Sequence, residues 1–586
     1  MRDVPANQYS VPTRLGHDRR GSGVVTISTS LLLSCRIACL LPYVLHLLGG
    51  EAEMLLAITF HARGTLTSSI VFVATCVETE TLLTVIRQPL TSIHTLDDDS
   101  LLHIFHSCRP NVLEEDKFGA IRLGDVVGEC WWYKIVQVCR RWRYLVLGSA
   151  SYLRLALLCT CGTPVADMLL HSPPLPLVIH HNDMNNDLSA EDEEGIMLAL
   201  QHHDRVRRIS LRIPVPSLQK VVVAIDVEFP ALELLIIKPP LEQNGRLSLP
   251  PTFEAPQLRH LSLNYFTSPF GSPLLMSAVG LVILFLPQTH ASTYIQPELF
   301  LRTISFLPHL EELEIGYVCA VPNSEIESQF LHAPITTQVT LPSLRRFAFW
   351  GTSGYLETLL PHMTTPLLQA LDVNFFNQLS FTVPRLLQFT IATYDLRFSR
   401  ATLFFHYEGV SMILDNPLEG AGPAQLDYFS TSITCRHLDW HVSSITQILN
   451  DLRPALSSVV DLILDYREHT LSSELHNDVD PTLWREFLGS FRNLQTLRVH
   501  KGLVGDISRS LQLDGEQLLE LPELKELVCP TESVEEKSFA TFIHYREVAG
   551  QPVKLIGETF PVGQMSYRVS TPTGMIDIEP DPEPLP

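Results

Sequence analysis

The sequence predicts an α/β fold in which a small helical domain precedes a solenoid of helices and short strands, with a parallel strand on one face. Three observations predict it: a leucine pattern that recurs along most of the chain, strand and helix signals that alternate from about residue 160, and two segments with a helical apolar period. The predicted domains are an N-terminal extension at 1–90, the helical domain at 91–158, the solenoid at 159–550 and a C-terminal segment at 551–586.

The composition indicates a globular chain with a large core, because 45% of its 586 residues are hydrophobic and only 18% are charged. The formal net charge of -22 argues against nonspecific nucleic-acid binding, which needs a basic surface. The 11 cysteines are odd in number and irregularly spaced, which fits reduced thiols better than a disulfide framework. We therefore expect an acidic interaction or enzyme domain in the cytoplasm or nucleus.

Residues 1–90 form an apolar extension whose status the sequence leaves open. The apolar stretch 24–48 follows two arginines, as the stretch of a membrane anchor does. However, Arg36 divides it into two runs, each shorter than the roughly 20 residues that span a bilayer. A second apolar run, 54–76, is also broken by polar residues, so we favour a poorly folded or extraneous extension over an anchor. At the other end, the acidic, proline-rich tail 571–586 is expected to be disordered.

The stretch 96–105 predicts a short helix. Its three consecutive aspartates, Asp97 to Asp99, supply an N-cap and a negative charge that a helix start favours. Apolar residues then recur at helical spacing, namely Leu101, Leu102, Phe105 and Cys108.

The stretch 131–147 predicts a second helix. Its apolar stripe consists of Ile135, Val138, Cys139, Trp142 and Leu145. Its polar face, expected to stay in water, consists of Lys134, Gln137, Arg140 and Arg141. Further apolar residues make it richer in hydrophobic surface than a helix with one packing partner needs. It is therefore either a core helix packed on two sides or a helix that meets another protein.

The two segments together resemble an F-box. Its first half is matched by Leu96, Asp98, Asp99, Leu101, Leu102, Ile104 and Phe105, and its second half by Val138-Cys139-Arg140-Arg141-Trp142. Two departures stand out: Asp97 replaces the family's proline, and 109–130 looks like an insertion between the halves. The chain is also similar to fungal F-box proteins in which a Trp-Trp pair, this helix and a Gly-Thr-Pro-Val segment follow one another.

The resemblance implies a non-enzymatic, substrate-recognition subunit of a ubiquitin ligase, which binds a Skp-type adaptor and through it a cullin. Asp97 in place of proline is expected to loosen the first helical turn. The residues that the resemblance assigns to adaptor binding are Leu96, Leu101, Ile104, Phe105, Val138, Cys139, Trp142 and Leu145. The alternative from another class is a membrane-anchored repeat protein without a ligase role.

After the helical domain the sequence alternates helices and strands. Thr163 and Pro164 predict a helix start, and Leu177 to His180 a short buried strand. Ser189 and the acidic residue three positions later form a capping-box signal for a helix through about His202, and 206–211 predicts the next strand. Such an order suits parallel strands.

A leucine pattern then repeats: proline, any residue, leucine, two residues, leucine or phenylalanine, one residue, and an apolar residue. Clear copies begin at Pro230, Pro256, Pro308, Pro342, Pro366 and Pro384; weaker ones include 281–286, 459–464, 493–499 and 522–529. Recurrence at roughly 20 to 30 residues resembles an irregular leucine-rich repeat, in which each short strand buries its apolar side by stacking on its neighbours.

Target recognition is then expected on the alternate, outward strand positions. These are His260, Ser262, Asn264, Glu312, Glu314, Arg346, Trp350, Asp372, Asn374, Arg498 and His500. The target-binding prediction centres on Arg346, Trp350, Asp372 and Asn374, because Trp350 is a large aromatic of the kind enriched at interfaces. The alternative is a merely solvated face, or a Trp350 that packs under a loop.

No catalytic, cofactor or metal motif is evident. Cys159 and Cys161 are separated by one residue and have no second pair at zinc-site distance from them. The pairs His180-His181 and 202–203 lack the acidic partner of a zincin motif and are expected at strand and helix ends. We therefore predict no catalytic residues, no cofactor and no metal.

Overall fold

The computed structural model describes five short strands and the residues 96–108, 131–182, 188–239, 247–290, 295–318, 334–376, 381–393, 398–406, 409–416, 428–435, 437–466, 479–512, 521–530 and 538–558. Within them the fold is mixed α/β, with fifteen α-helices and a mostly parallel sheet of sixteen strands, and without a closed barrel. Internal contacts divide the chain into two units: one contains 1–110 and 131–153, and the other contains 111–130 and 154–586. We call them the helical unit and the sheet unit.

The helical unit begins with a capped helix, α4 (Asp98–Ser107). The Asp97 side chain accepts a hydrogen bond from the Ser100 backbone N–H at 2.6 Å, so Asp97 is the N-cap. The expectation that Asp97 loosens this turn is wrong, because its carboxylate satisfies an N–H group that a proline would leave bare. Leu101 and Phe105, one turn apart, are the buried residues of the helix.

The expected single helix at 131–147 is two helices, α6 (Trp131–Val136) and α7 (Arg140–Gly148), followed by α8 (Ala150–Leu153). Cys139 breaks it, because its backbone is extended, with φ −157° and ψ 171°. The Arg143 Nε donates to the Val136 carbonyl at 3.1 Å, which gives that helix-end oxygen a new partner. The break also changes which residues are buried: in these helices they are Trp132, Trp142, Val146 and Leu153.

The sheet unit contains one sixteen-stranded sheet, in which every neighbouring pair is parallel except β15–β16 and β16–β17. From one edge the order is β4-β5-β6-β7-β8-β9-β10-β12-β14-β17-β16-β15-β18-β19-β20-β21. The bounds are β4 (Leu157–Cys159), β5 (Leu177–Asn182), β6 (Val206–Arg212), β7 (Leu234–Ile237), β8 (His260–Asn264), β9 (Ile283–His290), β10 (Glu312–Val318), β12 (Arg346–Gly351), β14 (Ala370–Phe376), β15 (Arg400–His406), β16 (Gly409–Asp415), β17 (Tyr428–Thr434), β18 (Asp461–Tyr466), β19 (Thr496–Val499), β20 (Glu526–Pro530) and β21 (Lys554–Glu558).

Nearly every copy of the leucine pattern forms a strand, as predicted. The first leucine of the copy closes a turn: before β8, the Leu258 N–H donates to the Ala255 carbonyl at 3.1 Å. Equivalent bonds precede β7, β10, β12, β14, β19 and β20. The next two apolar residues of the copy, Leu261 and Leu263 in β8, are buried on one side of the strand. The repeated residues therefore build both the turn and the core.

The copy at Pro384 is an exception, because it forms the helix α16 (Pro384–Thr393) instead of a strand. The Glu357 carboxylate accepts from the backbone N–H groups of Arg385 and Leu386, each at 2.8 Å, and so satisfies the first turn of the helix. Its buried residues, Leu386, Phe389 and Thr390, follow helical rather than strand spacing. After α16, β16 runs antiparallel to its two neighbours, β15 and β17, and interrupts the parallel order where the sequence carries no clean copy.

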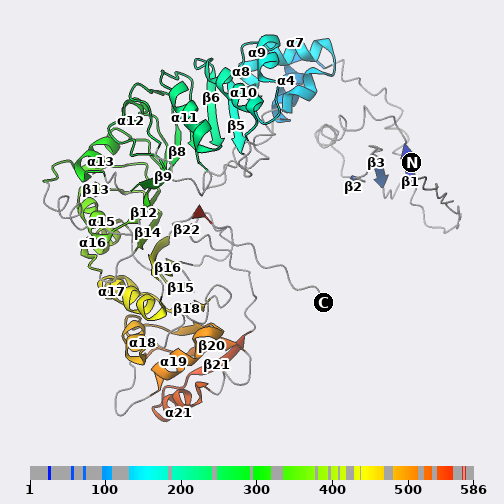
Figure 1. Ribbon diagram of the computed structural model, residues 1–586. Coiled ribbons are helices and arrows are strands. Elements are labelled where there is room, and N and C mark those ends of the chain that lie inside the picture. The colour runs from blue at the N-terminus through cyan, green and yellow to red at the C-terminus, as the bar shows by residue number, and fades with distance from the viewer. Residues whose placement is uncertain are drawn as a thin grey trace, which may run out of the picture. The chain divides into compact units, whose positions relative to one another are not determined.

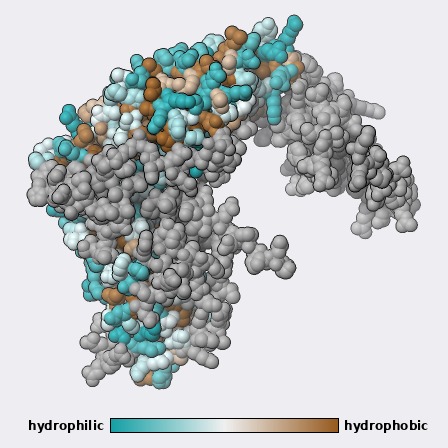
Figure 2. Space-filling view, in the orientation of Figure 1, coloured by the Kyte–Doolittle hydropathy of each residue, from teal (hydrophilic) through white to brown (hydrophobic). Residues whose placement is uncertain are grey.

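The helices of the sheet unit line one face of the sheet (Figure 1). They are α9 (Val165–His171), α10 (Ala190–Leu200), α11 (Val215–Ala224), α12 (Pro273–Ser277), α13 (Pro297–Ile304), α15 (Ser353–Leu359), α16, α17 (Leu438–Leu456), α18 (Pro481–Leu488), α19 (Val504–Leu511) and α21 (Ala540–Val548). The predicted helix start at Ser189 is confirmed, since its Oγ accepts from the Asp192 N–H at 3.0 Å and caps α10. The helix expected to start at Thr163 begins at Val165. On the side shown in Figure 2, the described surface mixes hydrophilic residues with small hydrophobic patches.

Several predictions fall wholly or largely outside the described residues. In the first 90 residues the structure describes only β1 (Val24–Ile27), β2 (Leu55–Ile58) and β3 (Ile70–Val73), which form a small antiparallel sheet. The expected insertion at 109–130 and most of the acidic tail lie outside, apart from β22 (Ser570–Thr571) and β23 (Gly574–Met575). Among the helices that the structure describes, none is long and apolar enough to cross a membrane.

Candidate functional site

The two halves of the F-box-like motif pack against each other in the helical unit. The rings of Phe105 on α4 and Trp142 on α7 meet edge to face, with centroids 4.9 Å apart. Such aromatic pairs contribute about 0.5–1.5 kcal/mol beyond the area that they bury. The helices α4 and α7 therefore share one small core although 109–130 separates them in sequence.

Arg141 adds a polar contact between the same two helices. Its guanidinium donates to the Asp98 carboxylate, from Nε at 2.9 Å and from Nη2 at 2.7 Å, and Nη2 also donates to the Leu96 carbonyl at 2.6 Å. The expectation that Arg141 faces only water is therefore wrong. The ion pair is exposed and adds little stability by itself. Its three bonds nevertheless fix the start of α4 against α7.

The predicted adaptor-binding residues divide into two groups by burial. Leu101, Phe105 and Trp142 are buried between the helices and are not available as a docking surface. The partly exposed group consists of Leu96, Ile104, Val138, Cys139 and Leu145. Sequence reasoning counted Tyr144, which is 78% exposed, among the further apolar residues of 131–147 but not among the adaptor-binding residues, and it missed the exposed Tyr152. Both fall off the apolar period, so the pattern gives no signal for them.

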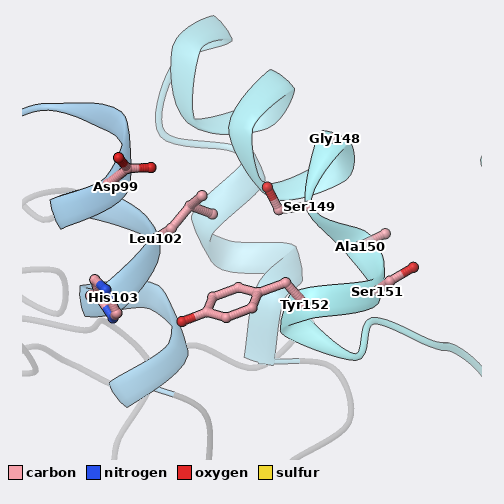
Figure 3. Close-up of a pocket in the computed structure, with 8 residues that line it drawn as sticks. All are labelled: Asp99, Leu102, His103, Gly148, Ser149, Ala150, Ser151 and Tyr152. Atoms are coloured by element: carbon pink, nitrogen blue, oxygen red, sulfur yellow. The ribbon is translucent and has the colours of Figure 1, made fainter.

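A shallow groove of about 680 Å³ lies between α4 and the α7–α8 turn. Its lining is Asp99, Leu102, His103 and the residues from Gly148 to Tyr152. The Tyr152 side chain reaches from α8 toward His103, and Leu102 points into the space between the helices (Figure 3). The Tyr152 ring also lies 5.2 Å from that of His106, centroid to centroid. The lining mixes polar residues with the apolar Leu102 and Ala150, which is the character of a protein contact rather than of a catalytic pocket.

On the sheet unit, the sheet face opposite the helices carries a buried cluster of charged side chains. We call this face of the sheet the charged face. Arg346 on β12 lies between two carboxylates, with Nη1 3.2 Å from Glu314 on β10 and Nη2 3.1 Å from Asp372 on β14. A third carboxylate, that of Glu312, lies 4.0 Å from Nη1 of Arg346. The Tyr428 hydroxyl on β17 donates to the Asp372 carboxylate at 2.9 Å. The Arg346 side chain is only 12% exposed. This network joins four adjacent strands of the sheet.

Burial and mutual attraction set the protonation of the network. Burial raises the pKa of Glu314 above its ordinary value, and the nearby charge of Arg346 offsets only part of this rise. Burial alone would lower the pKa of Arg346, yet Asp372 and Glu314 raise it above its ordinary value. Burial, then Asp372, raises the pKa of the Tyr428 hydroxyl. The cluster therefore holds a fixed positive charge between carboxylates.

The structure brings the four central target-binding candidates together on β12 and β14, where Trp350 and Asn374 are register partners. Trp350 is only 6% exposed and Asn374 is also buried, so Trp350 does not protrude as an anchor. The most accessible predicted side chains are instead Arg498 and His500, each about a third exposed. Nε of Arg498 lies 3.5 Å from the Asp461 carboxylate, and Nε2 of His500 lies 3.7 Å from the Asp465 carboxylate.

His260 on β8 is buried on the charged face, and its ring nitrogens have no hydrogen-bond partner among the described residues. Burial, assisted by Lys238, lowers the pKa of His260 from 6.5 to about 4. Between these values the unfolded chain binds a proton that the folded chain does not. The stability contributed by the neutral ring is present above pH 6.5 and is lost as the pH falls toward 4.

We therefore expect the free energy of unfolding to fall between pH 6.5 and 4.5, with His260 contributing on the order of 1–3 kcal/mol. Urea unfolding of the full chain at a series of pH values measures the slope. His260→Leu should make it less steep, while His181 and His441, whose pKa values burial also lowers to about 4, maintain the rest. The matched control, His309→Leu, removes an exposed histidine instead. Equal slopes in wild type and His260→Leu would contradict the assignment.

One pair of residues was missed altogether: the Cys161 sulfur lies 3.5 Å from Nδ1 of His181. The sequence shows a Cys-x-Cys and a His-His pair, but nothing in their spacing indicates that they meet. Among the described residues, no group of three or more His, Cys, Asp or Glu residues is placed to hold a metal ion.

Comparison with known proteins adds no family assignment. No protein-family model matches the sequence, and no curated protein matches it significantly.

Proposed function

We propose that this chain is a substrate-recognition subunit of a Skp–cullin–F-box ubiquitin ligase. In this proposal the helical unit is an F-box-like domain that binds the adaptor, and the sheet unit is a leucine-rich-repeat-like solenoid that binds the target protein. The observation that carries it is the packing of Phe105 on Trp142, which brings the two half-motifs into one helical unit.

The surface of the helical unit supports an adaptor contact. The partly exposed candidates flank the buried ones: Ile104 precedes Phe105 on α4, and Leu145 lies near Trp142 on α7. Tyr144 leaves a large apolar area in water beside them. Covering such side chains with a partner releases water from apolar surface, and this is the main favourable term in association.

Features of the sheet unit support a role in target recognition. Strands and helices repeat along it, and the charged face presents carboxylates and guanidinium groups whose positions the backbone register fixes. Arg498 and His500 are accessible there, each near an aspartate. A target segment with its own charged groups would exchange ion pairs with these residues, which favours specificity over raw affinity.

The test is binding of the full chain to a purified Skp-type adaptor. The double variant Ile104→Glu, Leu145→Glu changes only partly exposed positions and should weaken binding by at least about 30-fold, which corresponds to roughly 2 kcal/mol. Lys134→Ala, at an exposed position on α6, is the matched control and should bind as wild type does. Phe105→Ala and Trp142→Ala do not suit this purpose, because both residues hold the helices together. Absence of adaptor binding by the wild type, or unchanged binding by the double variant, refutes the proposal.

A further inference from the structure

Cys161 lies where the first two parallel strands of the sheet end. It follows the carboxyl end of β4 by two residues, and the residue is exposed. His181 belongs to the carboxyl end of the neighbouring strand, β5. In open parallel sheets this edge is where reactive and ligand-binding groups gather, because successive loops converge there. The two residues come together only through the pairing of β4 with β5.

A dense set of hydrogen bonds fixes the loop that carries Cys161. Gly162 has a positive φ of 71°, and its N–H donates to the Asp192 carboxylate at 2.8 Å. Thr163 closes the turn, as its Oγ1 donates to the Thr160 carbonyl at 2.6 Å. Asp192 is in turn held by the Ser189 hydroxyl, which donates to it at 2.7 Å. The thiol is therefore presented in a defined position, tied to the start of α10.

The Cys161 sulfur lies 3.5 Å from Nδ1 of His181, whose side chain is 1% exposed. The other ring nitrogen, Nε2, is buried without a hydrogen-bond partner among the described residues. The contact favours the sulfur anion when Nδ1 carries the ring hydrogen. An Nδ1–H donates to the sulfur anion and stabilises it, and this tautomer leaves the buried Nε2 as an acceptor rather than as an N–H group without a partner. Burial lowers the pKa of His181 to about 4, against a smaller opposing effect of Asp192, so the ring is neutral near pH 7.

We propose that Cys161 is a reactive thiol that hydroperoxides oxidise to a sulfenic acid. The sulfur attacks one peroxide oxygen, the O–O bond breaks, and the S–O bond forms. The thiol proton goes to the departing oxygen, which leaves as water from hydrogen peroxide or as an alcohol from an organic hydroperoxide. Sulfur is oxidised and the peroxide is reduced, so the step needs no other reactant. This inference does not rest on the proposed ligase function.

The chain provides internal controls for this chemistry. Cys159, two residues earlier, is fully buried, and burial raises the pKa of its thiol to about 12. Cys435 is also buried, with its thiol pKa raised to about 12. Cys108 and Cys139 are partly exposed. They test whether partial exposure elsewhere in the chain is enough for reaction.

The experiment treats the full chain with limiting hydrogen peroxide, traps sulfenic acids with dimedone and measures each cysteine by peptide mass spectrometry. Cys161 should react about tenfold faster than Cys108 or Cys139, the change that one pKa unit makes in a thiolate population. His181→Phe should remove that advantage, and His181→Gln, which keeps a polar side chain, should retain part of it. In both variants Cys159 and Cys435 should stay unmodified, because they remain buried as long as the sheet unit is folded. Their lack of modification therefore shows that the substitution has not unfolded the sheet unit. The proposal is overturned if Cys161 in the wild type reacts no faster than Cys108 and Cys139, or if His181→Phe leaves its rate unchanged.

Discussion

Replacing Arg346 with methionine is expected to destabilise the sheet unit by about 3–5 kcal/mol, the largest single effect on this face. The substitution keeps much of the side chain's volume but removes the charge that lies between Glu314 and Asp372. Both carboxylates then remain within the sheet without their partner. The cost arises from leaving buried charges uncompensated rather than from losing a favourable pair, because desolvation offsets most of the attraction in the intact cluster.

Two further variants separate this explanation from a general loss of packing. Glu314→Gln and Asp372→Asn, added to Arg346→Met, remove the uncompensated charges and should recover most of the lost stability. Arg498→Met breaks a more exposed pair with Asp461 and should cost less than about 1 kcal/mol. Urea unfolding gives the energies, and hydrogen exchange in β10, β12 and β14 locates the change. If the triple variant is as unstable as Arg346→Met alone, the charge explanation fails.

Trp142→Ala is expected to destabilise the helical unit by about 3–5 kcal/mol, as removal of a buried aromatic ring usually does. Trp142 is buried against Phe105 in a unit with few other large buried side chains among its described residues. Small domains have little stability in reserve, so a loss of this size is expected to unfold α4 and α7.

Hydrogen exchange followed by mass spectrometry measures this in the intact chain. The peptides that cover α4 and α7 should lose their protection, whereas those that cover β8 to β14 should keep theirs. Tyr144→Ala, two residues away but exposed, should leave both sets unchanged. Full protection of α4 in the Trp142→Ala variant would mean that the two half-motifs do not depend on each other.

Where a residue pattern recurs, the sequence predicted the local structure well. Leu258, Leu261 and Leu263 occupy the positions that the repeat assigns, and their burial in β8 follows from the alternation of side chains along a strand. Pro384 begins a similar pattern, yet α16 forms there. The Glu357 carboxylate on the neighbouring helix α15 binds the first N–H groups, and one sequence segment contains no information about such a distant partner.

For the candidate sites, the sequence by itself determined which residue types alternate on each strand, so it placed Arg346, Trp350, Asp372 and Asn374 on one face of adjacent strands. Only the tertiary structure decided how exposed they are and what they bind. Trp350 is buried and Arg346 lies between carboxylates, because neighbouring strands in register bring their side chains within contact distance. The same reason accounts for Cys161 and His181, whose contact depends on the pairing of β4 with β5 and not on their separation along the chain.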